Sequence, residues 1–487
     1  MLCRGGAVAL TKEQAPDTAK RLLVLREDEQ HRLNKVSAYV RGRQDSVYVP
    51  KGARQEYRWL IKRAKVNILP LVVTVVAQSL FVDGYRPERV DKNAKAWTYW
   101  QANRMDGRQH GLHRATLKYG VAYTLVLPGR LADQAMPVIT PKSPRRLTAF
   151  YEDPVEDEWP LYAVEVKTEN LPDGKRRQVV YLYDDTSRFM LVGDGKPGSR
   201  LVLDDSDDAV SEHGLDVCPV VRYLNGDDLD GDDCVTGEVE PLFDMQDQLN
   251  STTFGRMMAE QFAAFRQRYV SGMVAEDEEG RPQAPFAAAV DRLWVAEDPD
   301  TKFGEFGQTD LSGYLKSAEE TIRHIATVSQ TPPHNLLGQM ANLSAEALNA
   351  ARDGLNSKVA ERKSTLGESH EQTLRLSSLA AGDQNGWRDT SAQIVWRDTE
   401  SRSLAQTVDA LGKLVQMLGV PPEVLWERIP NVTQQDVERW KAAAEKGDPI
   451  GQLNARIDKQ TGAVAALDGA SAIGAAPSAS EPSGVPG

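Results

Sequence analysis

The feature that most constrains this chain is a pair of apolar-striped helices with an irregular insert between them. The first predicted helix runs from Pro241 to about Arg268, and the second begins after Asp310 and is expected to stop at Pro332-Pro333. Their stripes follow helical spacing and comprise Leu242, Met245, Leu249, Phe254, Met258, Phe262 and Phe265, then Leu311, Leu315, Ala318, Ile322 and Ile325. A third, longer helix is predicted from about Ser344 to Ala380. Because such rods cannot enclose a core alone, we expect an elongated subunit that buries its stripes against neighbouring copies.

The rest of the chain mixes helices and strands. Helices are predicted over 18–39, in much of 54–103 and again within 401–447. Short β-branched and aromatic runs are expected to form one sheet of antiparallel hairpins, namely Tyr123–Leu127, Ala163–Val166, Val179–Tyr183, Phe189–Val192 and Val217–Tyr223. Asp173-Gly174 is the clearest hairpin turn. The fold class is therefore α+β and predominantly helical, with one more strand expected at Leu293–Ala296.

Charge is distributed unevenly along the sequence. The net charge is -12, yet residues 1–130 hold 24 Lys and Arg against 11 Asp and Glu. Residues 131–487 hold 34 against 59. One interpretation is that the basic and acidic segments form two solvated surfaces whose charges offset each other. The other is that the basic segment binds an anionic partner and the acidic segment repels it.

The cysteines and the apolar segments limit the setting of the protein. Cys3, Cys218 and Cys234 are too few, and odd in number, for a disulfide framework. The most apolar stretch, Ile68 to Val82, is too short to span a bilayer, which takes about 20 residues. We therefore expect no membrane partner.

Catalytic, cofactor-binding and metal-binding motifs are not expected. The stretch around Gly195 and Lys196 lacks the spacing of a phosphate-binding P-loop, so ATP hydrolysis is not predicted. His110 and His113 could share a helix face, but zinc needs three or four ligands. An acidic run does not fit an EF-hand and is interpreted as a solvated loop; it comprises Asp227, Asp228, Asp230, Asp232 and Asp233.

One segment interleaves basic and aromatic side chains, namely Arg54, Tyr57, Arg58, Trp59, Lys62, Arg63 and Lys65. This pattern suits nucleic-acid binding through charge and stacking. It also suits an ordinary helix that partly buries Tyr57 and Trp59, which is the preferred interpretation.

Several segments resemble the siphophage-type portal proteins of tailed bacteriophages. Gly237-Glu-Val-Glu-Pro-Leu-Phe-Asp-Met-Gln-Asp-Gln-Leu-Asn-Ser-Thr-Thr is similar to the start of their first stem helix, which continues to Phe265-Arg-Gln-Arg-Tyr. The stretch Thr331-Pro-Pro-His-Asn-Leu-Leu-Gly to Asn342-Leu-Ser-Ala-Glu-Ala-Leu resembles their tunnel loop and the start of their long wing helix. The resemblance covers roughly residues 20–445, and the order and spacing of the segments carry it.

The resemblance implies a portal fold with wing, stem, clip and crown regions assembled as a ring. The implied regions are an N-terminal arm 1–19, wing 20–237, first stem helix 238–268, clip 269–310, second stem helix 311–328, tunnel loop 329–343, long wing helix with a following strand 344–400, crown helices 401–447 and a tail 448–487 that is expected to be disordered at least from 469.

The resemblance also implies which residues serve the channel. The implied tunnel-loop residues are Pro332, Pro333, His334, Asn335, Leu336, Leu337, Gln339, Met340 and Asn342. The implied stem residues are Leu249, Met258, Phe262, Leu315, Ile322 and Ile325, and the clip residues are Tyr269, Leu293, Trp294 and Val295.

The function implied by the resemblance is structural and not enzymatic. Family members form a dodecameric ring through which double-stranded DNA enters and leaves the head. Their implied partners are the terminase large subunit, a head–tail adaptor, and the major capsid and scaffolding proteins, in the virion and in the host cytoplasm during assembly. An acidic or neutral channel lining would give DNA a low-friction path, because a basic lining would hold its phosphates. The alternatives are another head–tail connector or minor capsid protein, and a nucleic-acid-processing enzyme.

Overall fold

The computed structural model describes residues 9–45, 55–88, 94–131, 133–170, 176–193, 200–226, 236–263, 268–271, 300–305, 310–338, 345–397, 404–429, 432 and 434–447. Contacts divide the chain into two compact units, residues 1–394 and residues 395–487. Helices dominate the described residues and strands form several small sheets, which confirms the predicted α+β class. None of the described helices is both long enough and apolar enough to cross a bilayer.

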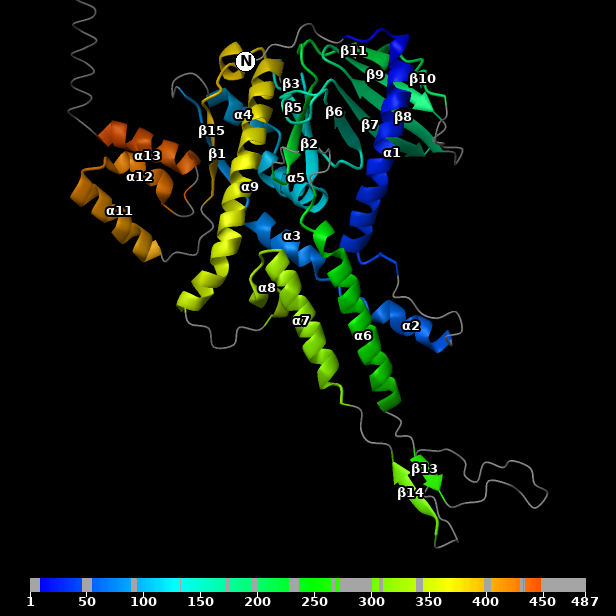
Figure 1. The fold of residues 1–487 in the computed structure, drawn as a ribbon. Coiled ribbons are helices and arrows are strands. Elements are labelled where there is room, and N and C mark those ends of the chain that lie inside the picture. The colour runs from blue at the N-terminus through cyan, green and yellow to red at the C-terminus, as the bar shows by residue number, and fades with distance from the viewer. Residues whose placement is uncertain are drawn as a thin grey trace, which may run out of the picture. The chain divides into compact units, whose positions relative to one another are not determined.

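The largest sheet of the first unit is antiparallel (Figure 1). Its strands follow the order β10-β9-β8-β7-β6, and β11 also pairs with β9. Their bounds are Leu147–Phe150 for β6, Tyr162–Asn170 for β7, Arg176–Tyr183 for β8, Ser187–Gly193 for β9, Val202–Leu203 for β10 and Val210–Glu212 for β11. Strands β7 and β8 pair as far as Asn170 opposite Arg176. They therefore flank the predicted Asp173-Gly174 turn, which itself lies outside the described residues.

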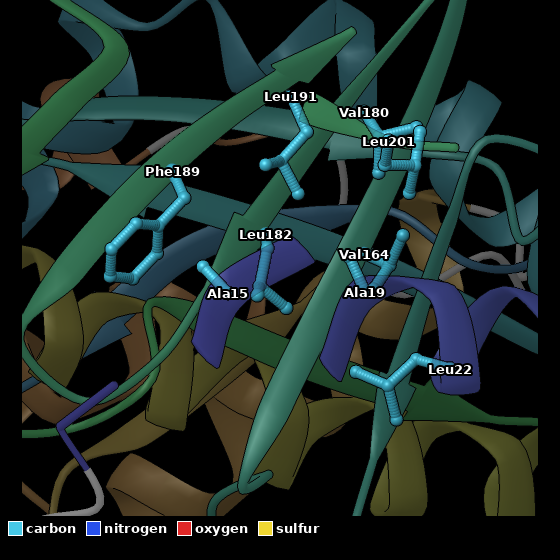
Figure 2. Packing of buried hydrophobic residues seen from close by; sticks show 9 residues of the cluster. All are labelled: Ala15, Ala19, Leu22, Val164, Val180, Leu182, Phe189, Leu191 and Leu201. Atoms are coloured by element: carbon cyan, nitrogen blue, oxygen red, sulfur yellow. The ribbon is translucent and has the colours of Figure 1, made fainter. Parts of the chain in front are cut away.

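Helix α1 (Gln14–Val40) lies against this sheet. Its buried face presents Ala15, Ala19 and Leu22. Figure 2 shows these residues packed against sheet residues and one neighbouring leucine, namely Val164, Val180, Leu182, Phe189, Leu191 and Leu201. The two alanines let the helix approach the sheet closely, so this part of the first unit has a continuous apolar layer. The predicted helix over 18–39 is confirmed and begins earlier, at Gln14.

A second, three-stranded sheet has the order β12-β2-β5. Its strands are β2 (Val121–Leu127), β5 (Val138–Lys142) and β12 (Val220–Leu224). The expectation of a single sheet was therefore wrong, because periodicity identifies strands without identifying their partners. A shared apolar cluster joins the two sheets, with Tyr123, Leu125 and Val220 from one and Leu147 and Ala163 from the other.

Among the residues that the structure describes, six further α-helices belong to the first unit, besides α1 and the helices of the rods and the loop described below. They are α2 (Gln55–Arg63), α3 (Leu69–Gln78), α4 (Ala94–Ala102), α5 (Met105–Tyr119), α9 (Ala345–Ala380) and α10 (Gln384–Trp387). The long helix α9 packs on α4 and on strands β2 and β12. Two short pairs complete this part, β1 (Val82–Arg86) with β15 (Gln393–Trp396) and β3 (Arg130–Leu131) with β4 (Gln134–Ala135).

The predicted pair of rods consists of α6 (Phe243–Ala263) and α7 (Ser312–Val328), which pack side by side (Figure 1). A one-turn 3-10 helix, η2 (Glu240–Leu242), precedes α6 and contains Pro241. Helix α6 ends at Ala263 instead of near Arg268, where the chain is already in strand β13. Strand β13 (Arg268–Ser271) pairs with β14 (Lys302–Glu305) beyond the ends of the rods (Figure 1). The predicted strand at Leu293–Ala296 lies outside the described residues.

The second unit is helical where it is described. Helix α11 (Leu404–Leu418) is followed by α12 (Pro422–Leu425), η3 (Trp426–Arg428) and α13 (Gln434–Gly447). Leu425 and Val437 are buried, and the rings of Trp426 and Trp440 meet edge to face at 6.2 Å between centroids. The three predicted terminal helices are therefore confirmed, joined by a 3-10 turn.

Candidate functional site

The two stem rods touch through a glycine on one and a tyrosine on the other. Gly255 on α6 faces Tyr314 on α7, and a Cβ at position 255 would lie 3.0 Å from the tyrosine ring. Leu249 on α6 and Ile325 on α7 are fully buried. These two predicted stem residues are therefore covered within the subunit itself.

Other predicted stem residues are not covered by the subunit itself. Leu315 is 52% exposed, and Val328 on the same helix is 49% exposed. Met258 and Ile322 are half-buried. Phe262 lies on α6, but its side chain is outside the described part of the structure. The predicted apolar stripe thus contains both buried and exposed side chains.

The start of the first rod is fixed to the long helix α9 by a buried group of charges. Glu238, just before η2, forms ion pairs with Lys358 and Arg362 on α9, the latter at 3.4 Å. Lys358 Nζ also donates to the carbonyl oxygen of Ser329 at 2.9 Å, and Ser329 closes the end of α7. A cation at a helix C-terminus is favoured by the helix dipole. One lysine therefore ties the start of α6, the end of α7 and the middle of α9 together.

Beside this group of charges, Gly237 and Glu238 contact the end of α5 through main-chain atoms alone. A Cβ at Gly237 would lie 2.3 Å from the carbonyl oxygen of Lys118 and 3.0 Å from the amide nitrogen of Gly120. The next residue, Glu238, donates its backbone N–H to the Leu117 carbonyl at 2.8 Å. Only glycine allows this approach of the start of the first rod to the end of α5.

The predicted tunnel loop begins with a left-handed turn. Gln330 has φ 52°. The N–H of Gln330 donates to the Thr327 carbonyl at 3.2 Å, and the N–H of Thr331 donates to the Ala326 carbonyl at 2.9 Å. These two bonds are the Schellman pattern that ends a helix. Helix α7 ends at Val328, which is the implied end of the second stem helix, but this left-handed turn ends it before Pro332-Pro333 is reached.

Pro333 instead starts a short helix, α8 (Pro333–Leu337), which places most of the predicted loop residues. Pro332 and Leu336 are buried, His334 and Leu337 are half-buried, and Pro333 and Asn335 are exposed. Gln339, Met340 and Asn342 lie outside the described residues. Of the predicted clip residues, Tyr269 lies on β13, and Leu293, Trp294 and Val295 lie outside the described residues.

A chain of buried polar groups lies beneath α9. His113 on α5 bonds the Leu80 carbonyl through Nδ1 at 3.2 Å and the His370 Nε2 through its own Nε2 at 2.8 Å. His370 Nδ1 lies 3.1 Å from the Tyr223 hydroxyl, which is 2.7 Å from the Thr373 hydroxyl. The chain is consistent when His113 carries its proton on Nδ1 and His370 carries its proton on Nε2. Every ring nitrogen then has a partner.

Burial keeps both imidazoles neutral. It lowers the pKa of His113 to about 4 and lowers the pKa of His370 well below its ordinary value. The sequence suggested that His110 and His113 could share a helix face, although two histidines are too few to bind zinc. The structure places the His113 ring against His370 instead, while His110 lies beside Phe81 at 5.4 Å between ring centroids. Within the described ranges, no three His, Cys, Asp or Glu side chains are grouped as metal ligands. The acidic run at 227–233 lies outside those ranges.

Sequence reasoning missed Glu238, Lys358 and His370 as structural groups. A usable signal existed for Lys358, because it stands beside the apolar stripe positions Leu355 and Val359. A lysine so close to an apolar helix face either lays its aliphatic chain along that face with the ammonium group in water, or is buried in an ion pair. Its partner, Glu238, is 120 residues away in the sequence and could not be identified by spacing.

A sequence profile described as "Phage portal protein, SPP1 Gp6-like" matches residues 22–449. The portal proteins of Mycobacterium phage D29 and Mycobacterium phage L5 are 26% and 25% identical over 363 and 370 residues, and each match covers 72% of both chains.

Two solved structures are also similar. A chain in the virion of a native gene transfer agent particle has a TM-score of 0.43 and 13% identity, over 82% of this chain and 99% of that one. A chain in the neck of a native gene transfer agent particle, solved with C12 symmetry, has a TM-score of 0.42 and 13% identity, over 80% and 99%.

The sequence matches define a structural protein of the phage head that is not an enzyme. The chain belongs to the SPP1 Gp6-like family of phage portal proteins. Its role is that of a portal subunit at a capsid vertex of the virion.

Proposed function

We propose that copies of this subunit close head to tail into a ring, dodecameric as in the family, with a central channel for double-stranded DNA. DNA enters the head through this channel during packaging and leaves through it during ejection. Head-to-tail contacts close into rings when the rotation between neighbours returns to its start. Assembly takes place in the host cytoplasm.

The observation that carries the proposal is the uncovered apolar surface of the stem. Leu315 and Val328 are half exposed on α7, and Met258 is half-buried on α6. Burying such side chains is worth about 1.5–3 kcal/mol each when burial is complete. A neighbouring copy that presents α6 to α7 would cover them, and the same contact repeated would build a ring of rods.

The regional layout is part of this proposal. The wing at 20–237, with the long helix and strand at 344–400, would meet the major capsid and scaffolding proteins. The clip at 269–310 would project the β13–β14 pair to the terminase large subunit and later to the head–tail adaptor. The loop at 329–343, rooted at Lys358, would line the narrowest part of the channel. The crown would be 401–447.

The charges on the exposed face of α7 suit a low-friction surface. Glu320 pairs with Arg323 at 3.7 Å and with His324 at 3.3 Å, and Glu319 also lies 3.9 Å from Arg323. Arg323 is thus paired with two glutamates and attracts phosphates more weakly than a free arginine would, whereas Lys316 on the same helix is exposed. In the proposed ring, this surface would let duplex DNA slide in both directions, whereas free cations would hold it through counterion release.

The ring is tested by imaging the purified full-length protein in negative stain, with size-exclusion chromatography in parallel. Wild-type protein should form rings with a central hole. The variant Leu315→Glu should remain largely monomeric, because a charge would enter the contact between neighbouring stems. The control variant Ser317→Glu places the same charge at an exposed polar position on the same helix and should form rings. A wild-type protein that stays monomeric, or a Leu315→Glu variant that closes rings normally, would overturn the proposal.

A further inference from the structure

A short helix beside the stem presents a face that the channel does not explain. Helix α2 packs on α6 and buries Leu60 and Ile61, and Ala64 directly after the helix is buried as well. Its opposite face leaves Lys62 and Arg63 exposed. Because the apolar face docks the helix firmly on the stem, the two cations are held on a fixed support.

The residues just after α1 bring two more cations, Arg41 and Arg43, to the same surface. Lys65 Nζ, just after α2, donates to the carbonyl oxygen of Gln44 at 2.5 Å. Asn67 Nδ2 donates to the Val40 carbonyl at 2.8 Å. These bonds hold the residues after α1 against the residues after α2. We name the resulting surface the basic corner, and it consists of Arg41, Arg43, Lys62, Arg63 and Lys65.

The charge of the basic corner is not offset locally. No ion pair joins these five cations to a carboxylate within the part of the chain that the structure describes, and Asp45 is the exposed acid next to them in sequence. Residues 41–65 hold eight Lys and Arg against two Asp and Glu, in a chain whose net charge is -12. An uncompensated cluster of this kind in an acidic protein is an attractive site for a polyanion.

One of the cations is also oriented. The guanidinium of Arg63 lies over the ring of Trp59, 4.7 Å from its centroid, and Trp59 is 45% exposed. Stacking on an aromatic face restricts the guanidinium plane while leaving its N–H groups available. A planar fork held in this way suits a phosphate oxygen better than a freely moving side chain does.

We propose that the basic corner binds the phosphates of double-stranded DNA lying outside the channel. The surface is dense in Lys and Arg, which are typical of phosphate contacts. The cores of protein–protein interfaces are instead depleted in charge and in lysine particularly. This DNA contact is independent of the passage of DNA through the ring.

The probe is relaxed, covalently closed circular duplex DNA, which has no end to thread through a ring. Its binding to full-length wild-type protein is measured by filter retention between about 50 and 200 mM salt. The corner variant carries four substitutions, Arg41→Gln, Arg43→Gln, Lys62→Gln and Arg63→Gln. The control variant removes four exposed cations elsewhere, by Lys12→Gln, Lys20→Gln, Lys95→Gln and Arg114→Gln. A third variant exchanges Lys and Arg at the four corner positions and keeps the charge.

Wild-type, control and charge-preserving proteins should bind the circle with a steep salt dependence. The corner variant should bind at least about tenfold more weakly, and the slope of log K against log salt should fall by about 1 for each phosphate that the variant no longer neutralises. Equal binding by the corner variant and the control would overturn the proposal. A corner variant that no longer forms rings in negative stain would also overturn it, since the surface would then be a contact between copies. Either failure leaves the ring test at Leu315 unaffected.

Discussion

Acid should destabilise the first unit through its two buried histidines. His113 and His370 are fully buried and neutral, and each accepts or donates hydrogen bonds that need the neutral ring. In the unfolded chain both imidazoles titrate near their ordinary pKa of about 6.5. The unfolded state therefore binds protons at a higher pH than the folded state does. Stability is fully present above about pH 6.5 and is lost as the pH falls toward the folded-state pKa of His113, about 4.

The magnitude follows from the shift of His113. A histidine that is neutral when folded and protonated when unfolded changes the free energy of unfolding by up to about 1.4 kcal/mol per pH unit. With a folded-state pKa of about 4, His113 alone accounts for about 1.5 kcal/mol of lost stability between pH 6.5 and 5. His370 adds to this loss in the same direction, because burial also lowers its pKa.

The assay is equilibrium unfolding in urea at pH 7.5, 6.5, 5.5 and 5.0, at one fixed protein concentration because assembly contributes to stability. The variant His370→Phe keeps a ring next to Trp100 and Tyr223, whose centroids lie 5.2 and 4.8 Å from that of His370. Its pH dependence should be shallower than that of wild type. The control His324→Gln removes an exposed histidine and should match wild type. A wild-type stability that is flat from pH 6.5 to 5 would refute the reasoning.

Two further predictions concern the stem. Lys358→Met leaves the Ser329 carbonyl without its donor and leaves Glu238 with Arg362 as its remaining cation, so urea unfolding should show a loss of up to about 3 kcal/mol, the lower end for a broken buried pair. The double variant with Glu238→Gln should recover part of that loss, and an additive loss would contradict the pairing. Glu320→Lys places an unpaired cation on the exposed face of α7 and should slow DNA translocation in a packaging assay, whereas unchanged translocation would count against the proposed lining.

The helices could be predicted from sequence better than their ends could. Helical spacing identified α1, α6, α7 and α9, because each has a continuous apolar stripe. Helix α6 ends at Ala263 instead of near Arg268. Helix α7 does end at the implied bound, Val328, but the residue that ends it is the left-handed Gln330 and not the prolines that follow. Strand β5 escaped prediction because Pro141 lies inside it, and proline is usually depleted in strands.

The candidate site was accessible only in part. The predicted stem stripe contains Leu249 and Ile325, which are buried, and Leu315, which is exposed. Helical spacing puts all three on a stripe and does not indicate which of them the subunit covers. The polar contacts were out of reach for a different reason. His113 and His370 are 257 residues apart, and a pattern confined to neighbouring residues carries no information about such a contact.

The backbone contact at Gly237 has a mechanical consequence for the assembled portal. Main-chain atoms meet at this joint, so we expect the approach of the first rod to the end of α5 to be insensitive to side-chain changes along the rods themselves. In the proposed ring, we expect surface substitutions on the rods to change the contact with the neighbouring copy while this joint stays in place. We expect a relative with a markedly different pore width to differ at this joint and at Lys118–Gly120, before it differs in the rods.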